Sequence, residues 1–338
     1  MSRRLSVPEF IEYRAPSWLP GGHLQTLYPA LALGHRGPQF RRETWDTPDD
    51  DQIAIDWLDG AANQPLLVLF HGLEGSSRSH YSLSLFTAAQ VAGYRGAVPH
   101  FRSCGDFDNR LPRAYHAGDS VEIDWVLRRI RQQNPGVPVF AAGVSLGGNA
   151  LLKWLGEQGD EACKVVDGAA AVCAPLDLTE CGAVLDKGLN RQIYTREFLR
   201  TLKKKMSVKL RLHADVHIDQ NAIRRAVTLR EFDDLVTAPL HGFRDVDHYW
   251  SAASSKPHLK GIAVPTLILN AKNDPFVPAH ILPVQSEVSG AVTLLQPATG
   301  GHVGFADGMP PGQLTWLPRT LLTFFDAHLR AHKATQNP

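Results

Sequence analysis

The first residues whose types and spacing could do chemistry form the pentapeptide Gly143-Val-Ser-Leu-Gly147. The apolar run Val139–Ala142 leads into it, and residues 149–155 behind it have helical spacing. A serine on a sharp strand-to-helix turn needs small neighbours, and such a turn pushes its hydroxyl out of the sheet. The first N–H groups of the helix then face any negative charge that forms beside the serine. The pattern predicts Ser145 as a nucleophile, and on this pattern alone a glycine-rich loop with an ordinary surface serine stays open.

A general base and an orienting acid follow later in the chain. A serine hydroxyl is a weak nucleophile, so a base must take its proton and a third group must orient that base. Asp274 comes directly after the apolar run 264–270, and His302 lies in a glycine-rich loop after the strand-like run 291–296. This chain order is expected when nucleophile, acid and base sit on the ends of parallel strands in one sheet. We therefore predict a catalytic triad of Ser145, Asp274 and His302.

An oxyanion hole is the remaining requirement. One preorganised donor to the oxyanion is worth about 2.7–4 kcal/mol in other enzymes. The sequence predicts the backbone N–H groups of Leu146, just after the nucleophile, and of Leu73 for this role. Leu73 ends His71-Gly72-Leu73, which follows an apolar strand-like run. Gly72 lets the backbone approach closely, and we interpret His71 as shaping this active-site loop rather than as a base.

The elements that must position these residues alternate between strand and helix patterns. Such an alternation is typical of an α/β fold in which a mostly parallel central sheet carries helices on both faces. The first two strands read as a hairpin across a turn at 48–51. Strand patterns cover residues 41–47, 52–58, 65–70, 94–101, 137–142, 165–174, 264–270 and 291–296, and helical patterns cover residues 79–92, 119–133 and 313–331.

Residues 176–260 interrupt this alternation, because they are mostly helical and more polar and hold no strong strand pattern. They are predicted to form a helical cap or lid inserted over the carboxyl edge of the sheet. Residues 41–175 and 261–338 are then the two parts of the core.

Residues 1–40 are predicted to form an N-terminal arm packed on this core. The arm is rich in Pro and Gly, and it carries apolar side chains that would be poorly placed in solvent. These side chains are Trp18, Leu24, Leu27 and Tyr28.

Composition narrows the class of protein. The 338 residues are 43% hydrophobic and 20% charged, as in soluble globular proteins, and a net charge of +1 gives no reason to expect a nucleic-acid partner. The sequence shows neither a signal-peptide pattern nor an apolar run long enough for an integral membrane segment, so we expect a cytoplasmic protein. Its four cysteines lack metal-type spacing, and neither a cofactor nor a metal is expected. The oligomeric state stays open.

Several weaker patterns compete with these readings. Asn-Asp-Pro at 273–275 is also turn chemistry, so Asp245, Asp247 and Asp307 stay open as alternative acids. His213 and His217 alternate like metal ligands, but without a fourth ligand in view a polar surface is favoured. The basic stretch 200–211 could touch a phosphate-bearing or membrane surface, and a solvated helix face is favoured. His302 and Asp307 also match a His-x4-Asp pattern of glycerolipid acyltransferases, which we treat as coincidence.

With these residues in hand, the chain resembles the YheT-like group of α/β-hydrolases, which is related to yeast ethanol acyltransferases and to mammalian α/β-hydrolase-domain lipases. The resemblance runs from about Pro16 to the final helix. The segments that carry it are Pro16-Ser-Trp-Leu-Pro-Gly-Gly-His-Leu-Gln-Thr26, His71-Gly-Leu-Glu-Gly-Ser76, Asn109-Arg-Leu-Pro-Arg-Ala-Tyr-His-Ala-Gly118, Gly143-Val-Ser-Leu-Gly-Gly-Asn149, Phe232-Asp-Asp-Leu-Val-Thr-Ala-Pro239 and Gly300-Gly-His-Val-Gly-Phe305.

The resemblance implies an α/β-hydrolase fold with Ser145 as nucleophile, Asp274 as acid and His302 as base. It also implies hydrolysis of carboxylic esters, with short- to medium-chain acyl esters or monoacylglycerols as the substrate class. Ser103 departs from the family pattern, which usually has Gly there, and the membrane anchor with which eukaryotic relatives tend to begin is not expected here. Two rival functions stay open: an acyltransferase that passes the acyl group to an alcohol, and a binding protein that kept the fold without the chemistry.

Overall fold

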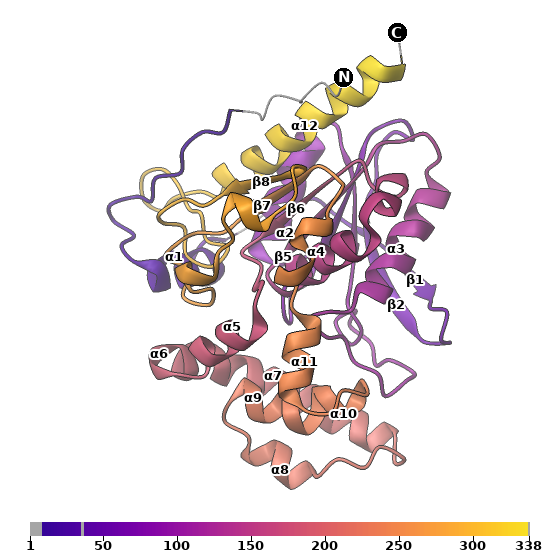
Figure 1. The fold of residues 1–338 in the computed structure, drawn as a ribbon, viewed down its shortest axis with the longest axis vertical. Coiled ribbons are helices and arrows are strands. Elements are labelled where there is room, and N and C mark those ends of the chain that lie inside the picture. Colours follow the sequence, from indigo (N-terminus) through magenta and orange to yellow (C-terminus); the bar gives the residue numbers. More distant parts are fainter. Residues whose placement is uncertain (1–8, 35–36, 337–338) are drawn as a thin grey trace.

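The computed structural model describes residues 9–34 and 37–336 and is built around one eight-stranded sheet (Figure 1). The strand order is β1-β2-β4-β3-β5-β6-β7-β8. The first two pairings, β1 with β2 and β2 with β4, are antiparallel, and the others are parallel. The strands are β1 (Arg41–Asp46), β2 (Gln52–Leu58), β3 (Leu66–Phe70), β4 (Arg95–Pro99), β5 (Val139–Val144), β6 (Gly168–Val172), β7 (Thr266–Leu269) and β8 (Val292–Leu295).

Helices cover both faces of this sheet. On one face α3 and α4 pack against alternate strand residues such as Leu66 and Val68, and on the other α2 and α12 pack against Leu67 and Leu69. This two-sided burial explains the continuous apolar runs of the parallel strands. The α-helices are α1 (Gly22–Leu31), α2 (His80–Val91), α3 (Ser120–Gln133), α4 (Leu146–Gln158), α5 (Leu178–Leu185), α6 (Gly188–Asn190), α7 (Arg196–Leu212), α8 (Gln220–Arg225), α9 (Leu229–Phe232), α10 (Ala238–Leu240), α11 (Val246–Ala253) and α12 (Trp316–Gln336).

Shorter helical turns complete the fold. Two of them, η2 and η3, are π-helical, and the others are 3-10 turns. They are η1 (Gly159–Lys164), η2 (Arg191–Thr195), η3 (Asp233–Thr237), η4 (Lys256–Gly261), η5 (Ala279–Ile281) and η6 (Gln285–Glu287). The predicted α/β-hydrolase architecture and the predicted hairpin of the first two strands are thus confirmed.

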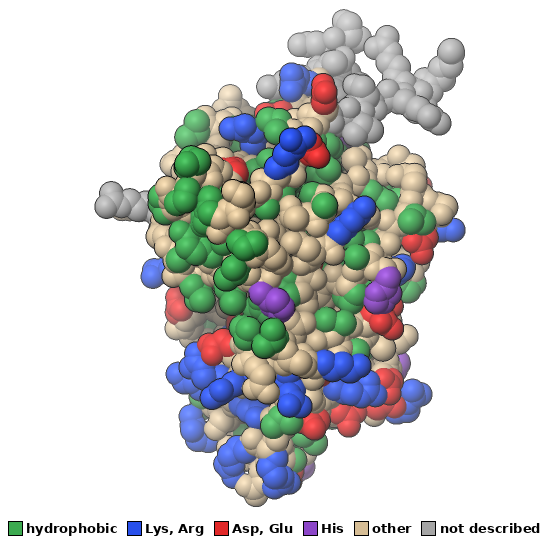
Figure 2. Space-filling view, turned by 90° about the vertical axis from the view of Figure 1, so that its left-hand side faces the viewer, with side chains coloured by type: hydrophobic (Ala, Val, Ile, Leu, Met, Phe, Trp, Pro, Cys, Tyr) green, Lys and Arg blue, Asp and Glu red, His purple; other side chains and the backbone are tan. Residues whose placement is uncertain are grey.

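Between β6 and β7 the chain holds helices and no strand. Figure 1 shows α5 and α7 to α11 gathered at one end of the molecule, beyond the sheet and away from α12. We call this segment the cap, and its boundaries at residues 176 and 260 remain a prediction. Figure 2 shows Lys and Arg side chains concentrated at this same end.

The basic stretch 200–211 lies on α7, and the expectation of a solvated face is wrong for two of its lysines. Lys209 is buried, and its Nζ donates to the carbonyl oxygens of Leu111 and Arg113, each at 3.0 Å. The Nζ of Lys205 lies 2.7 Å from Oε1 of Glu74. These contacts fasten α7 to loops of the core.

The N-terminal segment holds a helix, α1, that its Pro and Gly content concealed. It begins without a side-chain cap and contains Pro29, so tertiary contacts rather than intrinsic propensity must hold it. The expectation that Leu24 is covered is wrong, since 49% of it is exposed, whereas its neighbours Gln25 and Thr26 are buried. Of the predicted arm, residues 1–8 and 35–36 lie outside the described residues.

No described helix combines the length and the apolar character needed to cross a membrane.

Candidate active site

Ser145 sits on a strained turn between β5 and α4. Its φ of 53° and ψ of −120° lie in a region that non-glycine residues rarely occupy, and the residue is the N-cap of α4. Both glycines of the motif are required by space. A Cβ on Gly143 would come within 2.5 Å of the carbonyl oxygen of Gly147, and a Cβ on Gly147 would collide with the carbonyl oxygen of Phe70. The helix begins at Leu146, three residues before the predicted start, so its first amides stand directly beside the Ser145 hydroxyl.

The structure brings the three predicted triad side chains into one hydrogen-bonded chain. His302 Nε2 lies 2.9 Å from Ser145 Oγ, and His302 Nδ1 lies 2.8 Å from Asp274 Oδ2. Because a carboxylate only accepts, Nδ1 carries the proton and Nε2 is free to accept the proton of the serine hydroxyl. The other Asp274 oxygen accepts the backbone N–H groups of Phe276 and Val277, which fixes the carboxylate.

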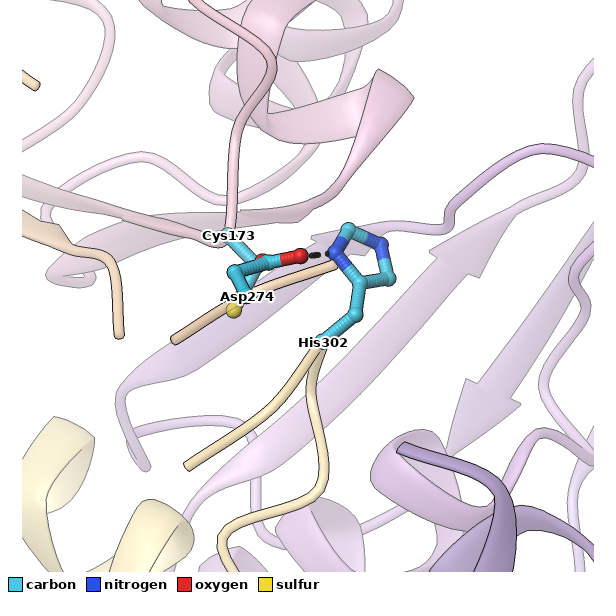
Figure 3. Close-up of side chains that lie close together, drawn as sticks. All are labelled: Cys173, Asp274 and His302. Carbon is cyan, nitrogen blue, oxygen red and sulfur yellow. Dashed lines mark hydrogen bonds and ion pairs between the residues drawn. The ribbon is translucent and has the colours of Figure 1, made fainter. Parts of the chain in front are cut away.

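The surroundings of the pair shield the Asp274 carboxylate from solvent and orient the imidazole. The Asp274 side chain is fully buried, and the Phe276 ring stacks on His302 with ring centroids 4.0 Å apart. Figure 3 shows the Asp274 carboxylate pointing at the His302 ring, with the Cys173 thiol beside it. Burial of the carboxylate strengthens its hydrogen bond to the imidazole.

The predicted active-site loop, at residues 71–75, lies against Ser145. A Cβ on Gly72 would stand 3.2 Å from Cβ of Ser145. The amides on both sides of Leu73 are held by buried tyrosines, because Gly72 N–H donates to the Tyr81 hydroxyl at 2.9 Å and Glu74 N–H to the Tyr115 hydroxyl at 3.0 Å. Within the described chain the N–H groups of Leu73 and Leu146 have no acceptor, and both residues line the same pocket as Ser145. They are therefore available to an oxyanion.

His71 is fully buried behind this loop. Its Nδ1 donates to the Gly72 carbonyl at 2.8 Å, and its Nε2 accepts the Phe101 N–H at 3.1 Å. Burial lowers the pKa of His71 to about 3, and the charges of the neighbouring His100 and Lys205 add to this effect. A neutral imidazole with both nitrogens engaged has no part in proton transfer, and its contacts hold the shape of the loop.

The alternative acids lie elsewhere. Asp307 accepts from the Thr315 hydroxyl, Asp245 caps α11, and Asp247 pairs with Arg230. None of them is hydrogen-bonded to His302, so among the described aspartates Asp274 alone occupies the orienting position.

One set of potential metal donors coincides with this site. Among the described residues, the single group of three or more close His, Cys, Asp or Glu donors is Cys173, Asp274 and His302. The imidazole and carboxylate already bond each other, and burial with the nearby Asp274 charge raises the pKa of the Cys173 thiol well above its usual value. These donors do not fit a metal, since a protonated thiol is no ligand. His213 and His217 belong to no such group.

Sequence reasoning missed two residues that support the acid and base loops. Thr26 Oγ1 accepts the backbone N–H of His302 at 2.8 Å. Gln25 Oε1 accepts the N–H of Gly300 and the side-chain amide of Asn273, both at 2.9 Å. A Cβ on Gly304 would overlap the carbonyl oxygen of Gln25, so α1 touches this loop backbone to backbone. The motif Gly-Gly-His-Leu-Gln-Thr was the available signal, but its partners lie about 275 residues away in the chain.

Replacing Thr26 by alanine is expected to lower kcat about tenfold to a hundredfold, because the His302 loop loses its anchor and small misplacements are costly. KM should change less than threefold, since Thr26 does not line the pocket that contains Ser145. Steady-state kinetics on a simple ester checks this. Thr26→Ser, which keeps the hydroxyl, should stay within threefold of the unsubstituted protein. Equal loss in both variants would refute a role for the hydroxyl.

A pocket of about 880 Å³, open solvent at its mouth included, extends from the triad into the cap. Its core side is formed by Ser145, His302 and the two leucines of the predicted oxyanion hole. Its cap side is mainly apolar and includes Leu185, Phe198, Leu202, Leu229, Phe232 and Trp250. Such a lining suits a hydrocarbon chain, with polar groups confined to a few positions.

Ser103, which departs from the family pattern, has a φ of 64°. This left-handed conformation favours glycine, which explains the usual residue at this position. The Ser103 amide is held by Asn109 Oδ1, and this contact helps to keep the serine in place.

Comparisons with known proteins identify the family of the chain. The family model described as alpha/beta hydrolase fold matches residues 65–308. YheT of Escherichia coli K12, whose name marks it as a proposed esterase, is 36% identical over 96% of this chain and 95% of its own. Phospholipase ABHD3 of Mus musculus is 31% identical over 93% of this chain and 78% of its own.

A solved structure extends the likeness to the fold. The esterase Pf2001 of Pyrococcus furiosus superposes with a TM-score of 0.55 over 87% of this chain and 95% of its own, at 14% sequence identity. At that identity the likeness concerns the fold alone.

Proposed function

The chain belongs to the YheT-like group of the α/β-hydrolase family and is an esterase- or lipase-type hydrolase, and we propose that it cleaves carboxylic esters through Ser145, His302 and Asp274. The observation that carries this proposal is the continuous path from Ser145 Oγ through His302 to Asp274. It lies at the end of a largely apolar pocket and on a strained turn.

The proposed reaction has two halves. His302 Nε2 takes the proton as Ser145 Oγ attacks the ester carbonyl, and Asp274 stabilises the imidazolium that forms. The Leu73 and Leu146 amides receive the oxyanion, and the proton on Nε2 then passes to the leaving alkoxide. Water, deprotonated by the same nitrogen, releases the acid from the acyl-enzyme. Fixed amides and a buried carboxylate need little reorganisation during these steps, which favours the transition state.

We propose short- to medium-chain acyl esters or monoacylglycerols as the substrates. The pocket beyond Ser145 is lined mainly by aliphatic and aromatic side chains of the cap, so each buried methylene contributes about 0.8 kcal/mol. Burial of this size corresponds to about a fourfold gain in kcat/KM per methylene until the chain outgrows the pocket.

A series of p-nitrophenyl esters tests this substrate class. Butyrate and octanoate are expected to turn over faster than acetate, and the rise should end at the acyl length that fills the pocket. Product analysis in the presence of added ethanol distinguishes hydrolysis from acyl transfer, and we expect the free acid to dominate. Flat dependence on chain length would refute the pocket assignment, and no turnover of any ester would refute the proposed activity.

A further inference from the structure

The cap side of the pocket carries one acid. Among the described residues that line it, Asp233 is the single carboxylate, and neither Lys nor Arg lies beside it in this lining. Asp233 begins the π-helical turn η3, a kind of turn that is frequent at functional sites. Asp233 is half-buried, and it contributes to the lining of the pocket.

The hydrogen bonds of Asp233 leave acceptor capacity free. Oδ1 accepts from the Thr237 hydroxyl at 2.6 Å, and Oδ2 accepts from Trp250 Nε1 at 2.8 Å. Each carboxylate oxygen can accept about two hydrogen bonds, so each has room for one more. Thr237 and Trp250 also line the pocket, so all three residues surround the same space.

The charge on Asp233 has no cationic partner among the described residues. Arg230, three residues earlier, pairs with Asp247 and lies over the Trp250 ring. The other charged or titratable groups around Asp233 are the carboxylate of Asp186, the Tyr249 phenol on α11 and His116 across the pocket. Burial, and to a lesser degree Asp186, raises the pKa of Asp233 to about 6.

A structural role alone does not explain a carboxylate here. An asparagine could accept from Trp250 and donate to the Thr237 hydroxyl without a buried charge. A carboxylate shielded from solvent and without a cationic partner is costly, and a hydrogen-bond donor on the substrate would offset that cost. The adjacent Asp234 is exposed and accepts the Val246 N–H, which is an ordinary structural contact.

We propose that Asp233 is a substrate-recognition residue whose carboxylate accepts a hydrogen bond from a hydroxyl or ammonium group on the ester. This inference rests on the proposed esterase function and narrows its substrates. They carry a hydrogen-bond donor on the part held beneath the cap, either on the acyl chain or on the alcohol. A polar group in the lining of an apolar pocket discriminates strongly, because an analogue that lacks the donor leaves the carboxylate unpaired.

Matched esters test the proposal with the full-length protein. The acyl-side set is p-nitrophenyl octanoate, ω-hydroxyoctanoate and ω-aminooctanoate, and the alcohol-side pair is monooctanoylglycerol and propyl octanoate. In one of these two sets the unsubstituted protein should prefer the donor-bearing ester over the plain ester. Asp233→Asn should reduce that preference, measured as the ratio of the two kcat/KM values, about tenfold or more. The substitution also relieves the unpaired carboxylate that a plain ester leaves, so turnover of the plain ester should rise while turnover of the donor-bearing ester falls. The control Asp234→Asn makes the same charge change outside the pocket and should leave the ratio unchanged.

The pH dependence of that ratio gives a second readout, because effects on the triad cancel between the two esters. Protonation of Asp233 removes the acceptor charge, so the preference of the unsubstituted protein should weaken as the pH falls through about 6 and should not do so in Asp233→Asn. The proposal would be overturned if, in both sets of esters, the ratio of kcat/KM in Asp233→Asn stayed within twofold of the ratio in the unsubstituted protein. Failure of the esterase proposal looks different, since even the plain esters would then be inert.

Discussion

Ser145→Ala is expected to lower kcat for p-nitrophenyl butyrate about 10⁴-fold to 10⁶-fold. Without Oγ no acyl-enzyme forms, and only binding and the oxyanion amides remain to accelerate attack by water. The loss should appear in kcat, while KM changes little, because the hydroxyl contributes mainly to the transition state. Background-corrected hydrolysis with purified protein measures it, and circular dichroism confirms that the variant folds.

A matched control for this loss is available on α2. Ser84→Ala removes a hydroxyl that donates to the Tyr81 carbonyl and lies outside the substrate pocket, so its kcat should stay within twofold. If Ser145→Ala kept more than a hundredth of the unsubstituted turnover, the hydrolysis would need another nucleophile.

Asp274→Asn is expected to lower kcat about 10⁴-fold with the fold intact. The amide can occupy the same space, but its NH₂ group can face His302 Nδ1 and favour the tautomer that protonates Nε2. The base then cannot accept the serine proton. Loss of the carboxylate also removes the charge that stabilises the imidazolium, and the fully buried position of Asp274 leaves no water to replace it.

The alternative acids supply the control for this second prediction. Asp307→Asn makes the same change in the same part of the chain, but Asp307 Oδ2 bonds Thr315 rather than His302, so kcat should fall less than threefold. A large loss with Asp307→Asn and a small one with Asp274→Asn would reverse the assignment of the acid. Ester hydrolysis at neutral pH, compared at saturating substrate, separates the two outcomes.

The parts of the fold that sequence predicted share a physical reason. Strands such as Leu66–Phe70 and Thr266–Leu269 are buried on both faces of a parallel sheet, so they appear as continuous apolar stretches. Residues that directly follow such runs must emerge at one edge of the sheet, which is why the amino-acid pattern alone pairs Ser145 with Asp274. His302 followed from the same rule after β8.

The parts that sequence did not predict depend on contacts between distant segments. Polar side chains are usually exposed and leucines usually buried, but α1 shows the opposite. Gln25 and Thr26 are buried because their side chains accept hydrogen bonds from backbone N–H groups of the His302 loop, whereas Leu24 is exposed. Nothing in residues 16–31 reveals those partners. The same holds for Lys209, which appears as one more charge in a basic run but donates to two carbonyl oxygens of the core.

The most direct test of the central claim is labelling by a fluorophosphonate, which reacts far faster with a serine activated by a base than with an ordinary hydroxyl. We expect rapid covalent labelling of the purified protein, with the added mass on the peptide that contains Ser145 and none in Ser145→Ala. Labelling should also be slowed strongly in Asp274→Asn, since the acid supports the base. Well-folded protein that fails to react, or that reacts at another serine, would contradict the proposal that Ser145, His302 and Asp274 form a working nucleophile.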